Sequence, residues 1–145
     1  MFNLVLSHFI GDFILQSHYI AERKLKNFLV CVLHVLLYII PFYFLVSANW
    51  KFLFVVAAAH LLIDFLRVAE LLSWLKNILI NPNIWLDTFW RSNQDASKRY
   101  NFYNCKYGYP ADIPEHVAFW LMIAVDQILH LATNALIYYL FVVKS

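Results

Sequence analysis

Long apolar stretches alternate with short polar ones along this chain. Four stretches are almost wholly apolar, namely residues 2–20, 28–46, 50–72 and 116–143. A helix needs about 20 residues to cross the hydrocarbon core of a bilayer, and an open sheet cannot span lipid. The pattern therefore predicts an all-α fold, a four-helix transmembrane bundle that forms a single integral membrane domain over residues 1–145.

The stretch between the third and fourth spans, residues 77–115, has a different character, with tryptophans and tyrosines among lysines and arginines. Such mixtures favour the headgroup region of a bilayer. We expect an aromatic interfacial loop there, with a short helix near residues 84–91. It would serve as an anchor or, alternatively, as a lid over a headgroup.

Basic residues also set the expected orientation. The loop after the first span and the loop after the third carry most of the lysine and arginine, whereas the second loop, "SANW", has only Lys51 beside it. The positive-inside rule places the first and third loops in the cytoplasm. We therefore expect a multi-pass protein of the bacterial inner membrane with both termini outside.

Composition narrows the function classes. The chain is 63% hydrophobic and 14% charged, whereas a soluble domain carries roughly a quarter of charged residues. Its net charge of +2 forms no basic stripe, so we expect a lipid environment and no nucleic-acid partner. Cys31 and Cys105 fit neither a metal motif nor a disulfide framework.

Ionisable residues inside the apolar segments are the main functional signal, because each costs roughly 2.5–3.5 kcal/mol to insert. There are seven of them: His8, Asp12, His34, His60, Asp64, Asp126 and His130. Six form three pairs spaced four residues apart, so each pair lies on one helix face. Counted from the cytoplasmic ends of the spans, four of these residues lie at one depth and three about one turn further out. The first layer holds Asp12, His34, Asp64 and Asp126, and the second holds His8, His60 and His130. Two amides, Gln16 and Gln127, accompany them.

Facing helices that project histidines and carboxylates into a bundle core hold metal ions in this way. The donors are nitrogen and oxygen without thiolate, which favours zinc, with manganese or iron as alternatives. All seven residues are candidate ligands, and Asp12, Asp64 and Asp126 are also candidate catalytic bases. Gln16 and Gln127 would orient ligands, or Gln16 would form a hydrogen bond between packed helices. Lys24 and Arg67, near cytoplasmic ends, would bind an anionic headgroup or anchor the topology.

The ordered motifs "HFIGDFILQ", "LHVLLY", "HLLIDFLR" and "DQILHLATN" resemble a bacterial integral membrane family known as domain of unknown function 3307. The resemblance implies a four-helix membrane architecture and supports the seven ionisable residues and two glutamines. Arg67 stands where the family commonly has lysine, and the loop at 81–115 lies outside the resemblance. No activity comes with the family.

The sequence thus favours a metal-dependent integral membrane enzyme, a hydrolase of a lipid or polyprenyl phosphate. A module for transport or binding of protons or divalent cations is the first alternative. Two further alternatives are a haem protein and a small structural subunit whose polar pairs hold helices together. Partners would be the bilayer, a lipid-phosphate substrate, and a second copy or a larger membrane complex.

Overall fold

The structure, a computed structural model, describes residues 1–46, 49–81, 102, 105–110 and 112–144. These residues form helices joined by turns, with no strand among them, so the fold is all-α as predicted. Internal contacts divide the chain into two compact units. The first comprises Met1–Arg67 and Ile128–Ser145, and the second comprises Val68–Gln127.

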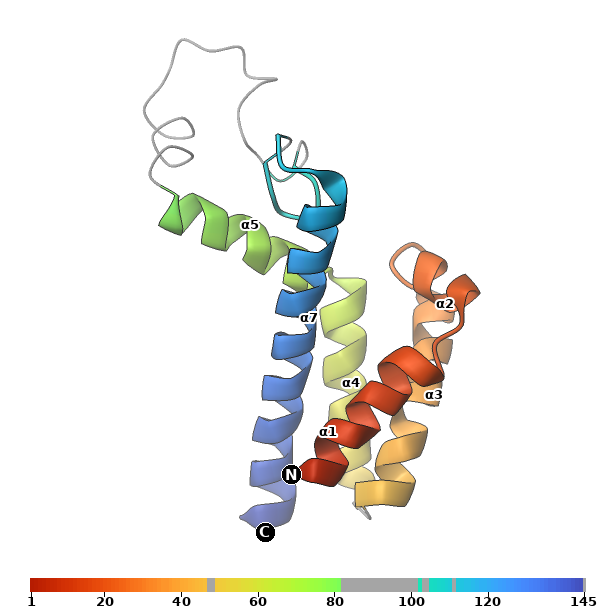
Figure 1. The fold of residues 1–145 in the computed structure, drawn as a ribbon. Helices are drawn as coiled ribbons and strands as arrows, with labels where there is room; N and C mark the ends of the chain where they lie inside the picture. The colour runs from red at the N-terminus through yellow and green to blue at the C-terminus, as the bar shows by residue number, and fades with distance from the viewer. Residues whose placement is uncertain (47–48, 82–101, 103–104, 111, 145) are drawn as a thin grey trace. The chain divides into compact units, whose positions relative to one another are not determined.

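The first unit is a helical bundle in which α3 packs against both α1 and α4 (Figure 1). Its elements are α1 (Phe2–Phe9), η1 (Ile10–Ile14), α2 (His18–Arg23), α3 (Phe28–Val46), α4 (Trp50–Phe65), the last turns of α7 (Glu115–Tyr138) and η3 (Tyr139–Val143). Six buried side chains form the core at one end: Leu4, Tyr38, Phe42, Phe52, Val56 and Ile137.

The first helix is shorter than predicted. The expected 2–20 span ends at Ile14, where the backbone widens into a π-helical turn closed by the Leu15 amide on the Ile10 carbonyl at 2.9 Å. Ser17 is extended (φ −72°, ψ 159°), and its hydroxyl accepts from the Ile20 amide at 3.4 Å. Serine is a preferred helix N-cap, so the chain starts a separate helix, α2, at this point.

Gly11, inside the π-helical turn, lies directly against α3. A Cβ atom built on Gly11 would lie 2.6 Å from Cδ2 of Tyr38 and 3.0 Å from its carbonyl oxygen. Only glycine permits so close an approach of two backbones. The contact sets the position of the following residue, Asp12, against α3.

The third predicted span is also interrupted. The expected 50–72 helix is divided into α4 and α5 (Val68–Ile80) by Arg67, whose φ of 53° lies in the left-handed region that ends helices. In contrast, α3 coincides with the predicted 28–46 segment, and α7 with η3 covers the predicted 116–143 segment.

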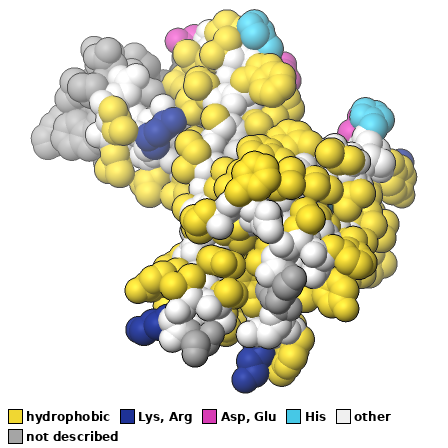
Figure 2. Space-filling model, turned by 60° about the horizontal axis from the view of Figure 1, so that its bottom comes forward, with side chains coloured by type: hydrophobic (Ala, Val, Ile, Leu, Met, Phe, Trp, Pro, Cys, Tyr) yellow, Lys and Arg dark blue, Asp and Glu magenta, His cyan; other side chains and the backbone are white. Residues whose placement is uncertain are grey.

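Within the part of the chain that the structure describes, two helices are long and apolar enough to cross a membrane, Phe28–Val46 and Glu115–Val143. A third is added if α4 and α5 form one broken span, whereas Phe2–Ile14 falls below the necessary length. The four-helix transmembrane bundle is therefore not confirmed. Figure 2 shows hydrophobic side chains over much of the face in view, with few charged groups among them.

The second unit contains α5, the first turns of α7 and a tight turn in which Lys106 and Tyr109 exchange two backbone hydrogen bonds of 2.8 Å. The short helix predicted near residues 84–91, and most of the aromatic loop around it, lie outside the described residues.

Candidate metal centre

A cluster of buried histidines and aspartates occupies the middle of the first unit. Its members come from four elements: Asp12 from η1, His34 from α3, His60 and Asp64 from α4, and His130 from α7. None of the five is more than 5% exposed. The predicted convergence of intramembrane histidines and carboxylates is thus present for these five residues.

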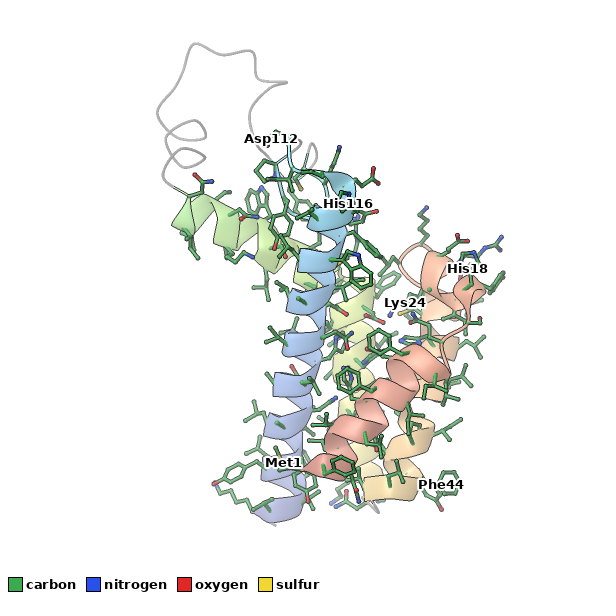
Figure 3. All side chains as sticks on the ribbon, viewed as in Figure 1. Met1, His18, Lys24, Phe44, Asp112 and His116 are labelled. Atoms are coloured by element: carbon green, nitrogen blue, oxygen red, sulfur yellow. The ribbon has the colours of Figure 1, made fainter. Side chains whose placement is uncertain are left out.

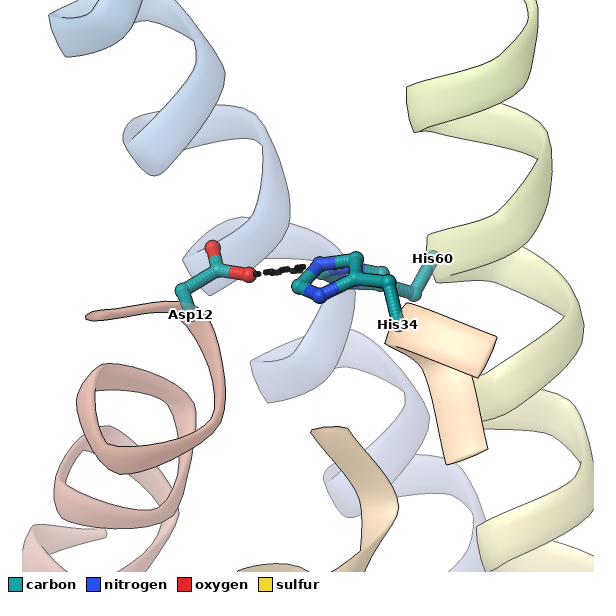
Figure 4. A group of neighbouring side chains, drawn as sticks. All are labelled: Asp12, His34 and His60. Carbon is teal, nitrogen blue, oxygen red and sulfur yellow. Dashed lines mark hydrogen bonds and ion pairs between the residues drawn. The ribbon is translucent and has the colours of Figure 1, made fainter. Parts of the chain in front are cut away.

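Asp12, His34 and His60 bring one donor atom each to a common point (Figure 4). The two imidazole Nε2 atoms are 3.0 Å apart. Oδ1 of Asp12 lies 3.2 Å from Nε2 of His34 and 3.4 Å from Nε2 of His60. The three atoms form a nearly equilateral triangle.

The size of this triangle matches a face of a zinc coordination tetrahedron. Zinc binds imidazole nitrogen and carboxylate oxygen at about 2.0–2.2 Å. At tetrahedral angles, two such ligands are separated by about 3.3–3.6 Å. The observed edges of 3.0, 3.2 and 3.4 Å agree with this spacing to within a few tenths of an ångström. Three protein ligands leave a fourth position, the arrangement of catalytic zinc sites.

Asp64 and Lys24 extend the cluster. Oδ2 of Asp64 lies 3.4 Å from Nε2 of both His34 and His60. It also lies 2.8 Å from Nζ of Lys24, which is 3.3 Å from Nε2 of His34. The Lys24 side chain is only 13% exposed. Lys24 points from the end of α2 toward the bundle, whereas His18 on the same helix points away (Figure 3).

The hydrogen-bonding capacity of the cluster favours a cation. A carboxylate only accepts, and an imidazole nitrogen carries at most one proton. Nε2 of His34 lies within 3.4 Å of another imidazole nitrogen, two carboxylate oxygens and the Lys24 ammonium. One proton cannot satisfy these contacts together, but a cation bound among Asp12, His34 and His60 would accept a lone pair from one atom of each of these three residues. The residues present therefore fit a divalent ion.

His8 belongs to a hydrogen-bonded chain beside the cluster rather than to the triangle. Nδ2 of Asn134 donates to the Tyr38 hydroxyl at 2.7 Å, so that hydroxyl can donate to Nδ1 of His8 at 2.9 Å. Nε2 of His8 lies 3.8 Å from Oδ2 of Asp12. The Tyr38 ring also stacks on His60 at a centroid distance of 3.7 Å.

Sequence reasoning missed Tyr38 and Asn134 as site residues. Each follows a predicted ligand by four residues, Tyr38 after His34 and Asn134 after His130. Residues four apart share a helix face, so extending the spacing argument to uncharged polar residues would have found both.

His60, Asp64 and His130 form a second group of three donors. Nε2 of His130 is 3.7 Å from Oδ1 of Asp64. The two groups share His60.

Four predicted site residues remain to be described, namely Asp126, Gln127, Gln16 and Arg67. Asp126 and Gln127 belong to the second unit, where Nε2 of Gln127 contacts Oδ2 of Asp126 at 3.5 Å, and their part in the site stays a prediction. Gln16 is half-buried beyond the π-helical turn. Arg67 forms the turn between α4 and α5, and its headgroup role also stays a prediction.

Comparison with known proteins assigns a family but no activity. No curated protein and no solved structure matches the chain. The profile of a family described as proteins of unknown function, DUF3307, matches residues 1–145. The expectation that the loop at 81–115 lies outside the resemblance was therefore wrong, because the match includes it. The chain therefore belongs to the DUF3307 family, as the ordered motifs of its apolar segments predicted.

Proposed function

We propose that this protein is a metal-dependent integral membrane enzyme that hydrolyses a lipid or polyprenyl phosphate. Asp12, His34 and His60 would hold the ion, with zinc preferred. The observation that carries the proposal is the triangle of their donor atoms, with edges of 3.0–3.4 Å, buried among apolar helices. A zinc ion bound there would act as a Lewis acid on a phosphoryl oxygen and would activate a water molecule for attack.

The charges around the triangle favour an anionic substrate. Asp12 and Asp64 contribute two negative charges, which a divalent ion balances. The Lys24 ammonium, 2.8 Å from Asp64, then leaves the cluster with one excess positive charge. A phosphate ester would neutralise it, because lysine binds phosphate as a point charge.

Two side chains of the chain itself have defined roles in this proposal. Oδ2 of Asp64, 3.4 Å from both triangle imidazoles, would accept the proton of the attacking water as general base. Lys24 would hold the phosphate and stabilise the charge that develops on it. A polyprenyl or acyl tail would stay in the bilayer.

The membrane arrangement is part of the same proposal. The apolar helices Phe28–Val46 and Glu115–Val143 would be full spans of the bacterial inner membrane, and the first helix and α4 would complete a four-helix bundle. The basic loops would face the cytoplasm and both termini the outside. In this orientation, Lys24 lies near the cytoplasmic ends of its helices, where a headgroup can reach it.

A second candidate function follows from the Lys24–Asp64 ion pair of 2.8 Å. The Lys24 ammonium places a positive charge beside the buried carboxylates without any metal ion. A relay that passes protons or cations along these side chains would need such a charge when no metal is bound. Intramembrane aspartates and histidines serve such relays in pumps. The two candidates differ in their need for a divalent ion.

The direct test is release of inorganic phosphate from undecaprenyl phosphate and from phosphatidic acid in mixed micelles with added zinc. We expect turnover by the wild type and loss of at least a hundredfold in Asp64→Asn, in which the base is replaced by an amide of the same shape. His18→Ala is the matched control, because the His18 side chain is 86% exposed. Its turnover should equal that of the wild type.

Equal turnover in Asp64→Asn and wild type would overturn the assignment of the base. No phosphate release by zinc-loaded wild-type protein from either lipid would overturn the hydrolase proposal. Decay of a proton gradient in vesicles containing chelator-treated protein, abolished by Asp64→Asn, would then support the relay.

A further inference from the structure

Helix α5 has its polar and apolar faces reversed relative to a helix on the surface of a soluble protein. Large apolar side chains on it are 37–72% exposed: Leu71, Leu72, Leu75, Leu79 and Ile80. Four of them follow the helical spacing that places them on one stripe. In soluble proteins this stripe would face the core.

The polar stripe of α5 is instead covered by the turn at Lys106–Tyr109. Nδ2 of Asn77 donates to the Gly108 carbonyl at 2.8 Å, and Nζ of Lys76 donates to the Tyr109 hydroxyl at 2.8 Å. Gly108 has φ +79°, and a Cβ atom there would lie 2.5 Å from the Glu70 carbonyl oxygen. The turn therefore fits closely against the polar face and leaves only the apolar stripe outward.

We propose that α5 lies along the bilayer interface, with this apolar stripe immersed at the boundary between headgroups and acyl chains. The inference rests on the membrane placement proposed above but not on the metal. A helix of 13 residues is about 20 Å long, which is short of the roughly 30 Å hydrocarbon core. Immersion of the apolar stripe in the interface explains why its leucines are exposed on the protein surface. The polar stripe, covered by the turn at Lys106–Tyr109, would then face water.

Aromatic side chains of the same unit support lipid as the occupant. Trp74 on α5 contacts Phe102 edge to face, Tyr107 contacts Phe119, and Trp120 is 65% exposed. Tryptophan and tyrosine concentrate at the headgroup level of membranes because their rings combine an apolar body with a polar atom. A helix with leucines outward and aromatic neighbours has the composition of an interfacial segment.

Spin labels can measure the depth of α5 directly. We would introduce Leu72→Cys, Leu75→Cys and Leu79→Cys one at a time into a Cys105→Ser background, since Cys31 is fully buried. The labelled proteins would be placed in vesicles of phosphatidylcholine and phosphatidylglycerol. Collisions with oxygen and with a water-soluble nickel complex give the depth. Leu36→Cys on α3, at a residue that is 55% exposed, marks the hydrocarbon core, and Lys26→Cys marks water.

The proposal predicts that all three α5 labels are oxygen-accessible at one shallow depth, about 5–10 Å below the headgroups. If α4 and α5 formed one span, the labels at 72 and 79 would differ in depth by about 10 Å, at 1.5 Å per residue. The proposal would be overturned by that difference in depth, or by nickel accessibility of the α5 labels equal to that of Lys26→Cys. It would also be overturned by immobilised α5 labels whose spectra show dipolar broadening from a second copy of the chain. A water-accessible label at Leu36→Cys would instead overturn the membrane placement itself.

Discussion

Replacing Lys24 by methionine tests whether its ammonium belongs to the buried cluster. Nζ of Lys24 is 2.8 Å from Asp64, whose side chain is 3% exposed. Removing one partner of a buried ion pair costs about 3–5 kcal/mol, because the other charge is left uncompensated. At roughly 2–4 °C per kcal/mol for a chain of this size, the melting temperature should fall by about 6–20 °C.

Zinc should reverse most of this loss. In chelator, Lys24→Met leaves Asp12 and Asp64 as two buried carboxylates without the ammonium, whereas a divalent ion restores the missing charge. Binding also stabilises by mass action, about 2.7 kcal/mol at a hundredfold excess over Kd. We therefore expect Lys24→Met to melt well below the wild type in chelator and close to it in zinc.

The assay is thermal unfolding of detergent-purified protein, followed by circular dichroism in chelator and in zinc. Lys26→Met is the matched control, because Lys26 is exposed two residues away, and surface substitutions usually stay within about 0.5 kcal/mol. An unchanged melting temperature of Lys24→Met in chelator would refute the buried ion pair. A loss that zinc does not reverse would refute the link between Lys24 and the metal site.

Two further substitutions test the support around the cluster. Gly11→Ala should destabilise the fold by about 1–3 kcal/mol, because the added Cβ meets Tyr38 at 2.6 Å. Replacing a helical glycine by alanine usually raises the melting temperature, and such a rise here would contradict the close approach. Tyr38→Phe removes the hydroxyl that joins Asn134 and His8, and we expect folded protein whose zinc affinity, measured by competition with a chromogenic chelator, falls about 10- to 100-fold. Unchanged zinc affinity in Tyr38→Phe would show that this hydrogen-bonded chain does not position the ligands.

The helix α3 was predictable because its apolar run is long enough to cross a bilayer. Residues 28–46 are apolar apart from His34, and Pro41 lies within a helix that continues past it. The interruptions of the other spans were harder to predict. Arg67 adopts a left-handed conformation without the glycine that usually marks such a turn. Ser17, in contrast, is a preferred N-cap residue, so the start of α2 had a local signal.

The cluster was predictable from spacing because ionisable residues are costly at membrane depth. Asp12 and His34, expected at one depth, do meet, and His60, expected about one turn further out, joins them. The position of Lys24 was not predictable, because a lysine near a span end usually extends toward water. Whether it extends toward water or into the bundle depends on how the α2–α3 turn is placed, which is a tertiary property.

The most direct test of the account is the metal content of untagged protein purified in detergent, measured by mass spectrometry for wild type, His34→Ala and His18→Ala. The account predicts about one equivalent of a divalent metal, zinc first, in the wild type. His18→Ala should retain the metal, and His34→Ala should lose it, because Nε2 of His34 is one of the three donor atoms of the triangle. Folded wild-type protein that binds no divalent metal, even after incubation with zinc, would contradict the account.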